Sequence, residues 1–358
     1  IMTEKVYRQL ADALNAMPEG FPPVPDDSHL RLLEYFFTPE EAALAAQLQI
    51  EVEPMRPLIK RLGGDPRETG AMLKDMAKRG LIKFGRSEAG SGFALEPFVV
   101  GIYENHAGRI DAEMAELFEK YYMAGFGNLL TSAPQAHRII PVQESVQSTS
   151  EIRPYESLIE IVKKAGSIGV QDCICRKQQE LVTGEACGHL MQVCMALAPM
   201  EGAFANSEIF KALTTEEALE LLKACAKDGL VHSVSNTQEG NYYICNCCDC
   251  CCGFLRGMKD LGIANVMARS AFVNTVDEDE CIACGACEEV CPFGALSMAD
   301  TIVVDAIKCT GCGVCIPACP TEALSLVRRP EHEIKPVPET HAHWANERHS
   351  LSNQNSQS

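Results

Sequence analysis

The sequence repeats one cysteine pattern near its C-terminal end, as Cys281-Ile-Ala-Cys284-Gly-Ala-Cys287-Glu-Glu-Val-Cys291-Pro292 and again as Cys309-Thr-Gly-Cys312-Gly-Val-Cys315-Ile-Pro-Ala-Cys319-Pro320. Each copy has the spacing C-x2-C-x2-C-x3-C-P, which is typical of bacterial 4Fe-4S clusters. Three thiolates on one tight loop fit three corners of a cubane cluster, and the fourth corner needs a sulfur from elsewhere. In two-cluster ferredoxins the other run supplies it. The pattern therefore predicts two ligand sets, Cys281, Cys284, Cys287 with Cys319, and Cys309, Cys312, Cys315 with Cys291.

Zinc ribbons and disulfide scaffolds are the alternatives for such cysteines. Zinc ribbons use two C-x2-C pairs separated by a longer loop, and four cysteines in one short run do not fit that spacing. The segments 295–298 (Ala-Leu-Ser-Met) and 323–326 (Ala-Leu-Ser-Leu) also follow their runs at the same offset. This duplication favours a ferredoxin domain at 276–329, with a short helix after each fourth cysteine and a strand near 301–304.

Composition narrows the class of protein. A chain of 358 residues with 46% hydrophobic content is long enough for two or three domains. No apolar run approaches the ~20 residues of a membrane span, and the polar N-terminal pattern lacks a signal-peptide core. Nineteen cysteines then indicate metal binding in a reducing cytoplasm. We therefore expect a cytoplasmic protein without membrane insertion, and the number of oxygen-labile clusters suggests an anaerobe.

The net charge is −18, which disfavours nucleic acid as a general partner. An acidic surface suits a low-potential electron carrier that is steered toward basic patches on redox partners. The same acidity also serves solubility alone, and the charge does not separate these two explanations.

Residues 1–150 contain no cysteine. Thr38-Pro39-Glu40-Glu41 predicts a helix start with a capping box, and Asp65-Pro66 predicts another. Two short strands follow at 81–84 and 93–95. Helix, helix and hairpin in this order predict a winged-helix-like module. Arg67, Lys74, Lys78 and Arg79 would then face a DNA groove in a regulator, but the acidic chain favours a docking or scaffold domain.

Residues 151–275 hold a second set of cysteines, and they repeat the helix-Gly-Leu-hairpin order of the first domain around Gly229. A strand points alternate side chains to opposite faces, so neighbours such as Cys247 and Cys248, or Cys251 and Cys252, would serve two different sites. We therefore expect a cysteine-rich domain with one or two additional 4Fe-4S clusters, or zinc as the rival metal. The candidate ligands are Cys173, Cys175, Cys187, Cys194, Cys247, Cys248, Cys251 and Cys252, with Cys245 and Cys250 in reserve.

The order of these motifs resembles a group of ferredoxin-like 4Fe-4S dicluster binding proteins of anaerobic bacteria. The resemblance covers roughly residues 30–330 and rests on C-x-C-R-K at 173–177, the Cys187/His189 pair, E-A-L-x-L-L-K at 217–223, N-C-C-x-C-C-C at 246–252 and the two ferredoxin runs. It also includes the stretch 97–104. What it implies is cluster binding and electron transfer, and it identifies no substrate. The predicted elements together indicate an α+β multidomain protein.

The remaining residues, 330–358, are poor in apolar side chains apart from Trp344 and predict a mobile or partner-ordered arm. The chain has no Rossmann fingerprint, P-loop or recognisable triad order. We therefore expect an electron-transfer subunit of a hetero-oligomeric complex whose partner is a flavin or molybdenum/tungsten oxidoreductase. Two alternatives stay open: a catalytic iron–sulfur enzyme with a substrate-binding central cluster, and a redox-sensing winged-helix regulator.

Overall fold

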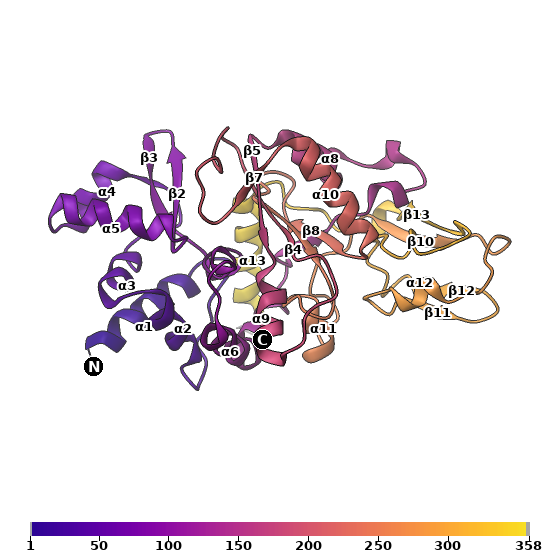
Figure 1. Ribbon diagram of the computed structural model, residues 1–358, viewed down its shortest axis with the longest axis horizontal. Helices are drawn as coiled ribbons and strands as arrows, with labels where there is room; N and C mark the ends of the chain where they lie inside the picture. The colour runs from indigo at the N-terminus through magenta and orange to yellow at the C-terminus, as the bar shows by residue number, and fades with distance from the viewer. Residues whose placement is uncertain (1, 356–358) are drawn as a thin grey trace. The chain divides into compact units, whose positions relative to one another are not determined.

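A computed structural model describes residues 2–355 (Figure 1). The chain forms two compact units. Unit 1 comprises Ile1–Leu129, Asp172–Cys187 and Ser207–Ile209, and unit 2 comprises Leu130–Gln171, Gly188–Asn206 and Phe210–Ser358. Within residues 2–355 every helix is too short or too polar to cross a lipid bilayer.

Unit 1 begins with three helices, α1 (Met2–Asn15), α2 (Ser28–Phe36) and α3 (Pro39–Ala45). The predicted capping box at the start of α3 is confirmed. The Glu41 backbone N–H donates to Thr38 Oγ1 at 3.3 Å, and the Thr38 N–H donates to Glu41 Oε2 at 2.9 Å. Both donors would otherwise lack a partner at the helix N-terminus, so the pair defines where α3 begins.

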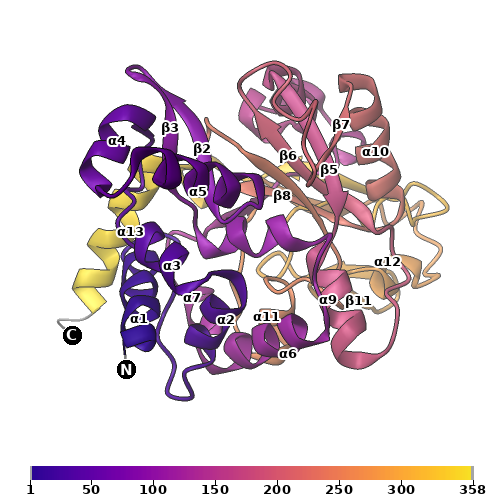
Figure 2. The same ribbon diagram turned by 60° about the vertical axis from the view of Figure 1, so that its left-hand side comes forward.

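Two further helices and a small sheet follow. These are β1 (Glu53–Pro54), α4 (Met55–Leu62), α5 (Pro66–Lys78), β2 (Ile82–Ser87) and β3 (Gly90–Leu95). Asp65 caps α5, because its side chain accepts from the N–H groups of Arg67 and Glu68. The strands form an antiparallel sheet in the order β1-β3-β2. The helices predicted to start at Thr38 and Asp65 are α3 and α5, and the predicted hairpin is β2 with β3, whereas α4 was not predicted; Figure 2 shows these elements.

The last part of the segment 1–129 of unit 1 forms an aromatic core. It lies among η1 (Phe98–Ile102), η2 (Glu104–His106), α6 (Ala112–Tyr121), η3 (Tyr122–Phe126) and α7 (Gly127–Leu129). The rings of Tyr103 and Phe118 stack with their centroids 3.8 Å apart. The ring centroids of Phe21 and Phe98 are 4.6 Å apart. Helix α9 (Ile174–Thr183), which carries the C-x-C-R-K motif at its start, packs on α6.

Unit 2 is built on a six-stranded sheet in the order β4-β8-β9-β6-β5-β7. The strands are β4 (His137–Ile139), β5 (Ser167–Asp172), β6 (Gln192–Ala198), β7 (Lys211–Leu213), β8 (Val231–Ser235) and β9 (Tyr243–Cys247). Helices α8 (Leu158–Lys164) and α10 (Thr215–Lys227) supply Val162 and Leu222 to a core that includes Val170, Met195 and Ile244 of the sheet. The short helices η4 (Gln143–Ser145), η5 (Thr149–Glu151) and η6 (Pro154–Glu156) lie between β4 and α8 in sequence. The sheet thus has a firm apolar core beside the strands that bear cysteines.

In sequence, the first ferredoxin run lies between β10 (Phe272–Val276) and β11 (Leu296–Met298), and the second lies between β12 (Ile302–Val304) and β13 (Leu324–Arg328). Strand β10 pairs with β13, and β11 pairs with β12, both antiparallel. Figure 1 shows these strands together with α12 (Ala286–Glu289). The short helices predicted after each fourth cysteine were wrong, because turns at 292–293 and 320–321 lead directly into β11 and β13. Their backbones pair with β12 and β10, and these cross-strand bonds replace the local ones of a helix. The helical turn instead precedes Cys291.

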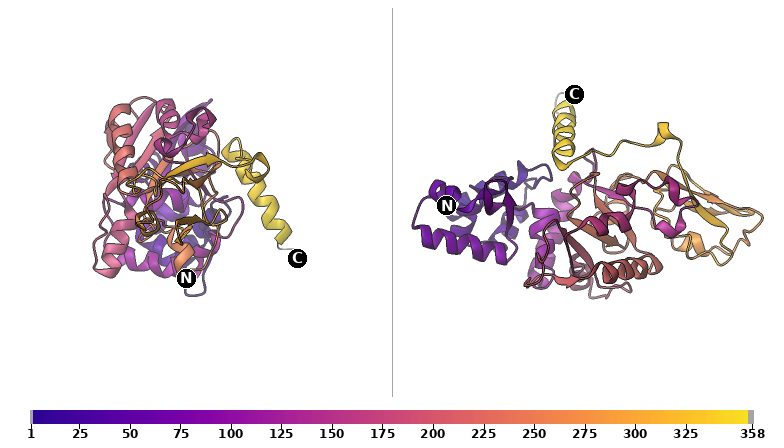
Figure 3. Two further views of the ribbon diagram at one scale, coloured as in Figure 1. Left: turned by 90° about the vertical axis from the view of Figure 1, so that its right-hand side faces the viewer. Right: turned by 90° about the horizontal axis from the view of Figure 1, so that it is seen from above.

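The C-terminal segment contains η7 (Glu331–Glu333) and the helix α13 (His341–Asn355), seen from above in Figure 3. The sequence predicted a mobile arm here. In the structure Trp344 is buried and its indole N–H donates to the Gln135 carbonyl at 3.0 Å. The Gln238 and Glu239 N–H groups donate to carbonyls of Pro338 and Glu339. These contacts tie the segment to unit 2, and residues 356–358 of the predicted arm lie outside the described residues.

Candidate metal centres

The first group of ferredoxin thiols lines one small pocket, to which both runs contribute. Cys281, Cys284 and Cys287 of the first run line it together with Cys319 of the second. Cys287 and Cys319 also interact electrostatically. This grouping is what the crossed ligand assignment requires, because one sulfur comes from the other run.

The second group is more deeply enclosed. Cys309, Cys312 and Cys315 are buried, and both Cys312 and Cys315 interact electrostatically with Cys291 of the first run. Burial raises the pKa of the Cys312 thiol to about 12. A thiol in such surroundings becomes a thiolate when a metal takes its proton's place. The structure thus brings the four predicted residues of each set together, and the ligand assignment itself stays a prediction.

Polar contacts from the protein support these sulfurs. Asn274 Nδ2 on β10 donates to Cys315 Sγ at 3.0 Å, and the Ala295 N–H donates to Cys291 Sγ at 3.4 Å. Such hydrogen bonds stabilise the charge on cluster sulfurs and tune their potential. Asn274 was not among the residues predicted from the sequence. The one sequence feature that could have pointed to Asn274 is its position in an apolar strand, seven residues before Cys281. A polar amide in such a strand needs a hydrogen-bond partner.

The loop of the second run also needs a glycine. Gly311 has φ +69°, and a Cβ there would lie 2.1 Å from the Phe272 carbonyl oxygen. The loop therefore presses directly against the backbone of β10, and this contact places Cys309 and Cys312 beside the strand that carries Asn274.

Comparison with known families agrees with this geometry. Residues 274–297 and 302–325 each match the 4Fe-4S binding domain family. The chain binds two 4Fe-4S clusters. No curated protein and no solved structure matches the chain. The two matched segments span the paired strands and both cysteine runs, so this part of the molecule is an iron–sulfur domain of ferredoxin type.

Outside this domain, four thiols gather in unit 2 and are here called the four-thiol group: Cys194, Cys245, Cys247 and Cys252. Strands β6 and β9 pair Met195 with Ile244, and continuing this antiparallel register by one residue sets Cys194 opposite Cys245. The Cys245 side chain hydrogen-bonds to those of Cys194 and Cys247 and interacts electrostatically with Cys252.

Strand alternation explains why the four-thiol group forms on one face. Cys245 and Cys247 are two residues apart on β9 and so share a face. Asn246 between them points the other way, where its Oδ1 lies 2.6 Å from His232 Nδ1 and its Nδ2 donates to the Val193 carbonyl. Cys245, only a reserve candidate from sequence, therefore stands among three other thiols.

A second gathering lies in the turn after β9. Cys248, Cys250 and Cys251, here called the turn thiols, have Sγ atoms that all lie within 4.8 Å of one another. Cys248 and Cys251 are buried and Cys250 is exposed. Cys187, another predicted ligand, is the last residue of its segment of unit 1.

Cys173 and Cys175 belong to unit 1, at the start of α9. Their side chains hydrogen-bond to each other, and Arg176 acts electrostatically on Cys173. Tyr103 is fully buried, its hydroxyl has no hydrogen-bond partner, and it interacts electrostatically with both cysteines. Tyr103 was not predicted from the sequence, because nothing in its local pattern distinguishes it from a core aromatic residue.

Two further residues of the central region, His189 and Cys225, lie outside both thiol groups. His189 Nδ1 lies 3.1 Å from the Asp228 carbonyl oxygen and 3.3 Å from its carboxylate. Cys225 is buried in α10, as expected of a small apolar side chain.

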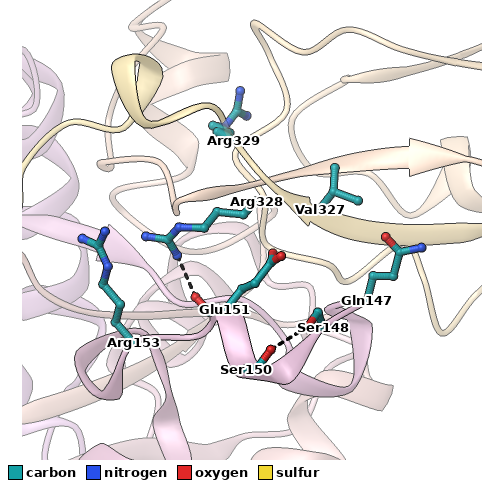
Figure 4. A pocket seen from close by; sticks show the side chains of 8 residues that line it. All are labelled: Gln147, Ser148, Ser150, Glu151, Arg153, Val327, Arg328 and Arg329. Atoms are coloured by element: carbon teal, nitrogen blue, oxygen red, sulfur yellow. Dashed lines mark hydrogen bonds between the residues drawn. The ribbon is translucent and has the colours of Figure 1, made fainter.

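Unit 2 also has an open pocket of about 480 Å³ beside the second run (Figure 4). Its lining includes three arginines, Arg153, Arg328 and Arg329. Arg329 donates to the Cys309 carbonyl at 2.7 Å, and Arg328 pairs with Glu156 at 2.9 Å. Figure 4 shows Arg328 reaching toward the backbone of Glu151. The pocket is thus lined by three arginines and Glu151, and Arg153 and Arg329 also have carboxylate partners, Glu331 at 3.1 Å and Glu333 at 3.7 Å.

Proposed function

We propose that the protein is an electron-transfer subunit that passes low-potential electrons to an oxidoreductase partner. The observation that carries this proposal is the pair of mixed thiol groups, each with three cysteines of one run and one of the other. When bound, the clusters supply one-electron redox centres. The protein's residues hold them, exclude water from Cys312 and Cys315, and donate hydrogen bonds from Asn274 and Ala295.

The crossed ligand assignment is tested by EPR of dithionite-reduced, anaerobically purified protein. Cys319→Ser should perturb the same signal as Cys281→Ser, and Cys291→Ser should perturb the signal that Cys309→Ser perturbs. If Cys319→Ser instead altered the Cys309 signal, the crossed assignment would be wrong. A protein that dithionite leaves spectroscopically unchanged would refute electron transfer itself.

We assign an additional 4Fe-4S cluster to the four-thiol group. Four thiolates match the usual ligand number of a cubane, and the register of β6 and β9 supports their convergence. The intact protein should then contain about twelve irons, against about eight for the ferredoxin domain alone. In Cys194→Ser/Cys245→Ser the iron should fall to about eight with both ferredoxin EPR signals retained. Unchanged iron in this variant would refute the assignment.

For the partner, we propose a flavin or molybdenum/tungsten oxidoreductase that docks over the arginine-lined pocket in the cytoplasm. The pocket supports this because Arg329 contacts the backbone of Cys309, so a partner bound there is near the second cluster. Crosslinking in extracts of the native host, compared between wild type and Arg153→Glu, tests the docking site. Equal crosslinking to a redox enzyme by both proteins would contradict it.

We further propose that α4, α5, β2 and β3 form a winged-helix module used for docking and not for reading DNA. Two of the four basic residues expected on a groove have acidic partners: Lys78 pairs with Glu208 at 2.8 Å, and Arg79 pairs with Asp75 at 2.8 Å and also with Glu41. These pairs reduce the positive charge available to phosphates. A gel-shift assay at low salt should show no binding, and salt-sensitive DNA binding would favour the regulator.

A further inference from the structure

The turn that joins β9 to α11 (Arg256–Asp260) packs three thiols unusually closely. Cys250 Sγ and Cys251 Sγ are 3.6 Å apart, Cys248 hydrogen-bonds to Cys251, and all three sulfurs lie within 4.8 Å of one another. Three thiolates at such distances repel one another unless a cation lies between them. Two of the three are buried, where that repulsion is poorly screened.

The distances between the sulfur atoms distinguish a site for a single metal ion from a site for a cluster. With Zn–S bonds of about 2.3 Å, tetrahedral geometry places neighbouring sulfurs about 3.8 Å apart. Ligands of a cubane lie farther apart, because each sulfur binds a different iron at a corner of the cube. Within the described part of the chain, neither the ferredoxin thiols nor the four-thiol group is as tight, because no three of their sulfurs all lie within 4.8 Å of one another. The turn thiols therefore have the spacing of ligands to one metal ion.

The neighbouring residues place the turn thiols in a site of their own. Cys247 and Cys252, which flank them, belong to the four-thiol group with Cys245. The Cys252 N–H donates to the Cys248 carbonyl at 3.2 Å, which closes the turn. Cys247 and Cys252 thus interact with Cys245, whereas the turn thiols interact with one another, so the turn thiols are not spare ligands of the four-thiol group.

We infer that Cys248, Cys250 and Cys251 bind a single zinc ion, separate from every iron–sulfur cluster of the chain. Thiolates select zinc, copper(I) or iron–sulfur clusters, and zinc is the divalent ion among these with the tetrahedral geometry that the spacing matches. A ligand from outside the turn completes the tetrahedron. The inference does not depend on electron transfer, because zinc has no redox chemistry.

The test begins with the wild-type holoprotein, purified anaerobically without added metal. Elemental analysis should find about one zinc per chain in addition to iron and acid-labile sulfide. X-ray absorption at the zinc edge reports only zinc, so the clusters do not obscure it. It should show at least three sulfur neighbours at about 2.3 Å. A preparation without zinc, or zinc with only nitrogen and oxygen neighbours, would overturn the inference.

Variants then locate the ion. Cys248→Ser/Cys250→Ser/Cys251→Ser should lose the zinc and keep its iron, its sulfide and both ferredoxin EPR signals. Cys225→Ala, which removes a buried thiol from α10, should keep the zinc. If the triple variant does not fold, the exposed Cys250→Ser alone should lose one sulfur neighbour at the zinc edge. Loss of iron together with sulfide from these variants would make the turn a cluster site, and one sulfide-free iron in place of zinc would refute the choice of metal.

Discussion

At the scale of single residues, the hydrogen bond from Asn274 to Cys315 has a measurable electrochemical consequence. The amide N–H at 3.0 Å stabilises negative charge on the sulfur, and reduction adds negative charge to the cluster. Asn274→Leu removes this donor with little change in side-chain size. The potential of the second cluster should therefore fall by on the order of 50 mV, from a charged hydrogen bond of about 1 kcal/mol.

An EPR-monitored redox titration measures the shift in potential. Thr321→Val is the matched control, because Thr321 Oγ1 lies 3.7 Å from Cys319 Sγ in the first group. Its smaller shift should appear in the other signal. Equal potentials for wild type and Asn274→Leu would show that this contact does not tune the cluster.

Gly311 and Ala283 occupy the same position in the two runs and differ in what they touch. Both have positive φ, +69° and +52°, which costs a non-glycine residue roughly 1–2 kcal/mol. Only Gly311 also faces a carbonyl oxygen at 2.1 Å from its would-be Cβ. Gly311→Ala should therefore lose about four irons and the second EPR signal, whereas Ala283→Gly should retain both clusters. Full iron content in Gly311→Ala would contradict the close contact.

Two carboxyl groups of unit 1 should make its stability depend on pH. Burial raises the pKa of Glu96 and of Glu104 from 4.5 to about 7, and for Glu104 the nearby Glu96 adds to the effect. Between pH 4.5 and 7 the folded chain holds protons that the unfolded chain has released. The free energy of unfolding should therefore fall as pH rises through this range, and the loss is complete above pH 7.

Glu96→Gln should make the free energy of unfolding of unit 1 depend less on pH. At pH 8 it should raise that free energy by about 1–2 kcal/mol, because the partly exposed Glu96 side chain is partly screened by solvent. Hydrogen exchange of the amides at 96–107, corrected for intrinsic rates, measures the effect in the full chain. Glu88→Gln, in the exposed turn of the hairpin, should behave as wild type. Stability that rose between pH 5 and 7 in wild type would contradict the sign.

At the scale of elements, the sequence predicted the features that depend on only a few neighbouring residues. The capping box at Thr38, the cap at Asp65 and the positions of the two cysteine runs follow from short motifs. The short helix predicted after Cys291 is absent because the chain turns there directly into β11, which pairs with β12, and a single sequence does not state that pairing. Similarly, the register of β6 against β9, which joins Cys194 to Cys245, is a tertiary property.

Helix α13 depends on one aromatic anchor. Trp344 is 3% exposed, the only tryptophan of the chain, and it donates to Gln135 while Arg348 lies over its ring. Trp344→Ala should release the helix and make the segment after Pro338 sensitive to limited proteolysis. His349→Ala, farther along the helix, should leave cleavage as in wild type. Equal resistance of wild type and Trp344→Ala would show that the helix is held by other contacts.

At the scale of the whole molecule, charge and composition predicted the class of protein better than its internal organisation. Nineteen cysteines and a net charge of −18 indicated an acidic iron–sulfur protein. The division of the central cysteines into a four-thiol group and the turn thiols depends on strand pairing and turn geometry, which composition does not contain. For the same reason Cys245 and Cys250 were placed in reserve and Tyr103 was overlooked.

The arginine-lined pocket should also affect reactions with charged oxidants. Arg153 is 44% exposed at its rim, so Arg153→Glu reverses a charge there without disturbing a core. Oxidation of the reduced protein by anionic hexacyanoferrate should slow several-fold, relative to oxidation by cationic hexaamminecobalt. Stopped-flow absorbance measures both rates, and Lys259→Glu, outside the pocket, is the control. An unchanged ratio in Arg153→Glu would mean that electrons do not leave by this face.

The direct succession of Cys247 and Cys248, and of Cys251 and Cys252, has a mechanical consequence. Consecutive Cα atoms are 3.80 Å apart, so two inorganic centres held by such neighbours share one short piece of backbone. If both proposed centres are present, loss of the metal from one would free backbone that also positions a ligand of the other, so the two occupancies would be coupled.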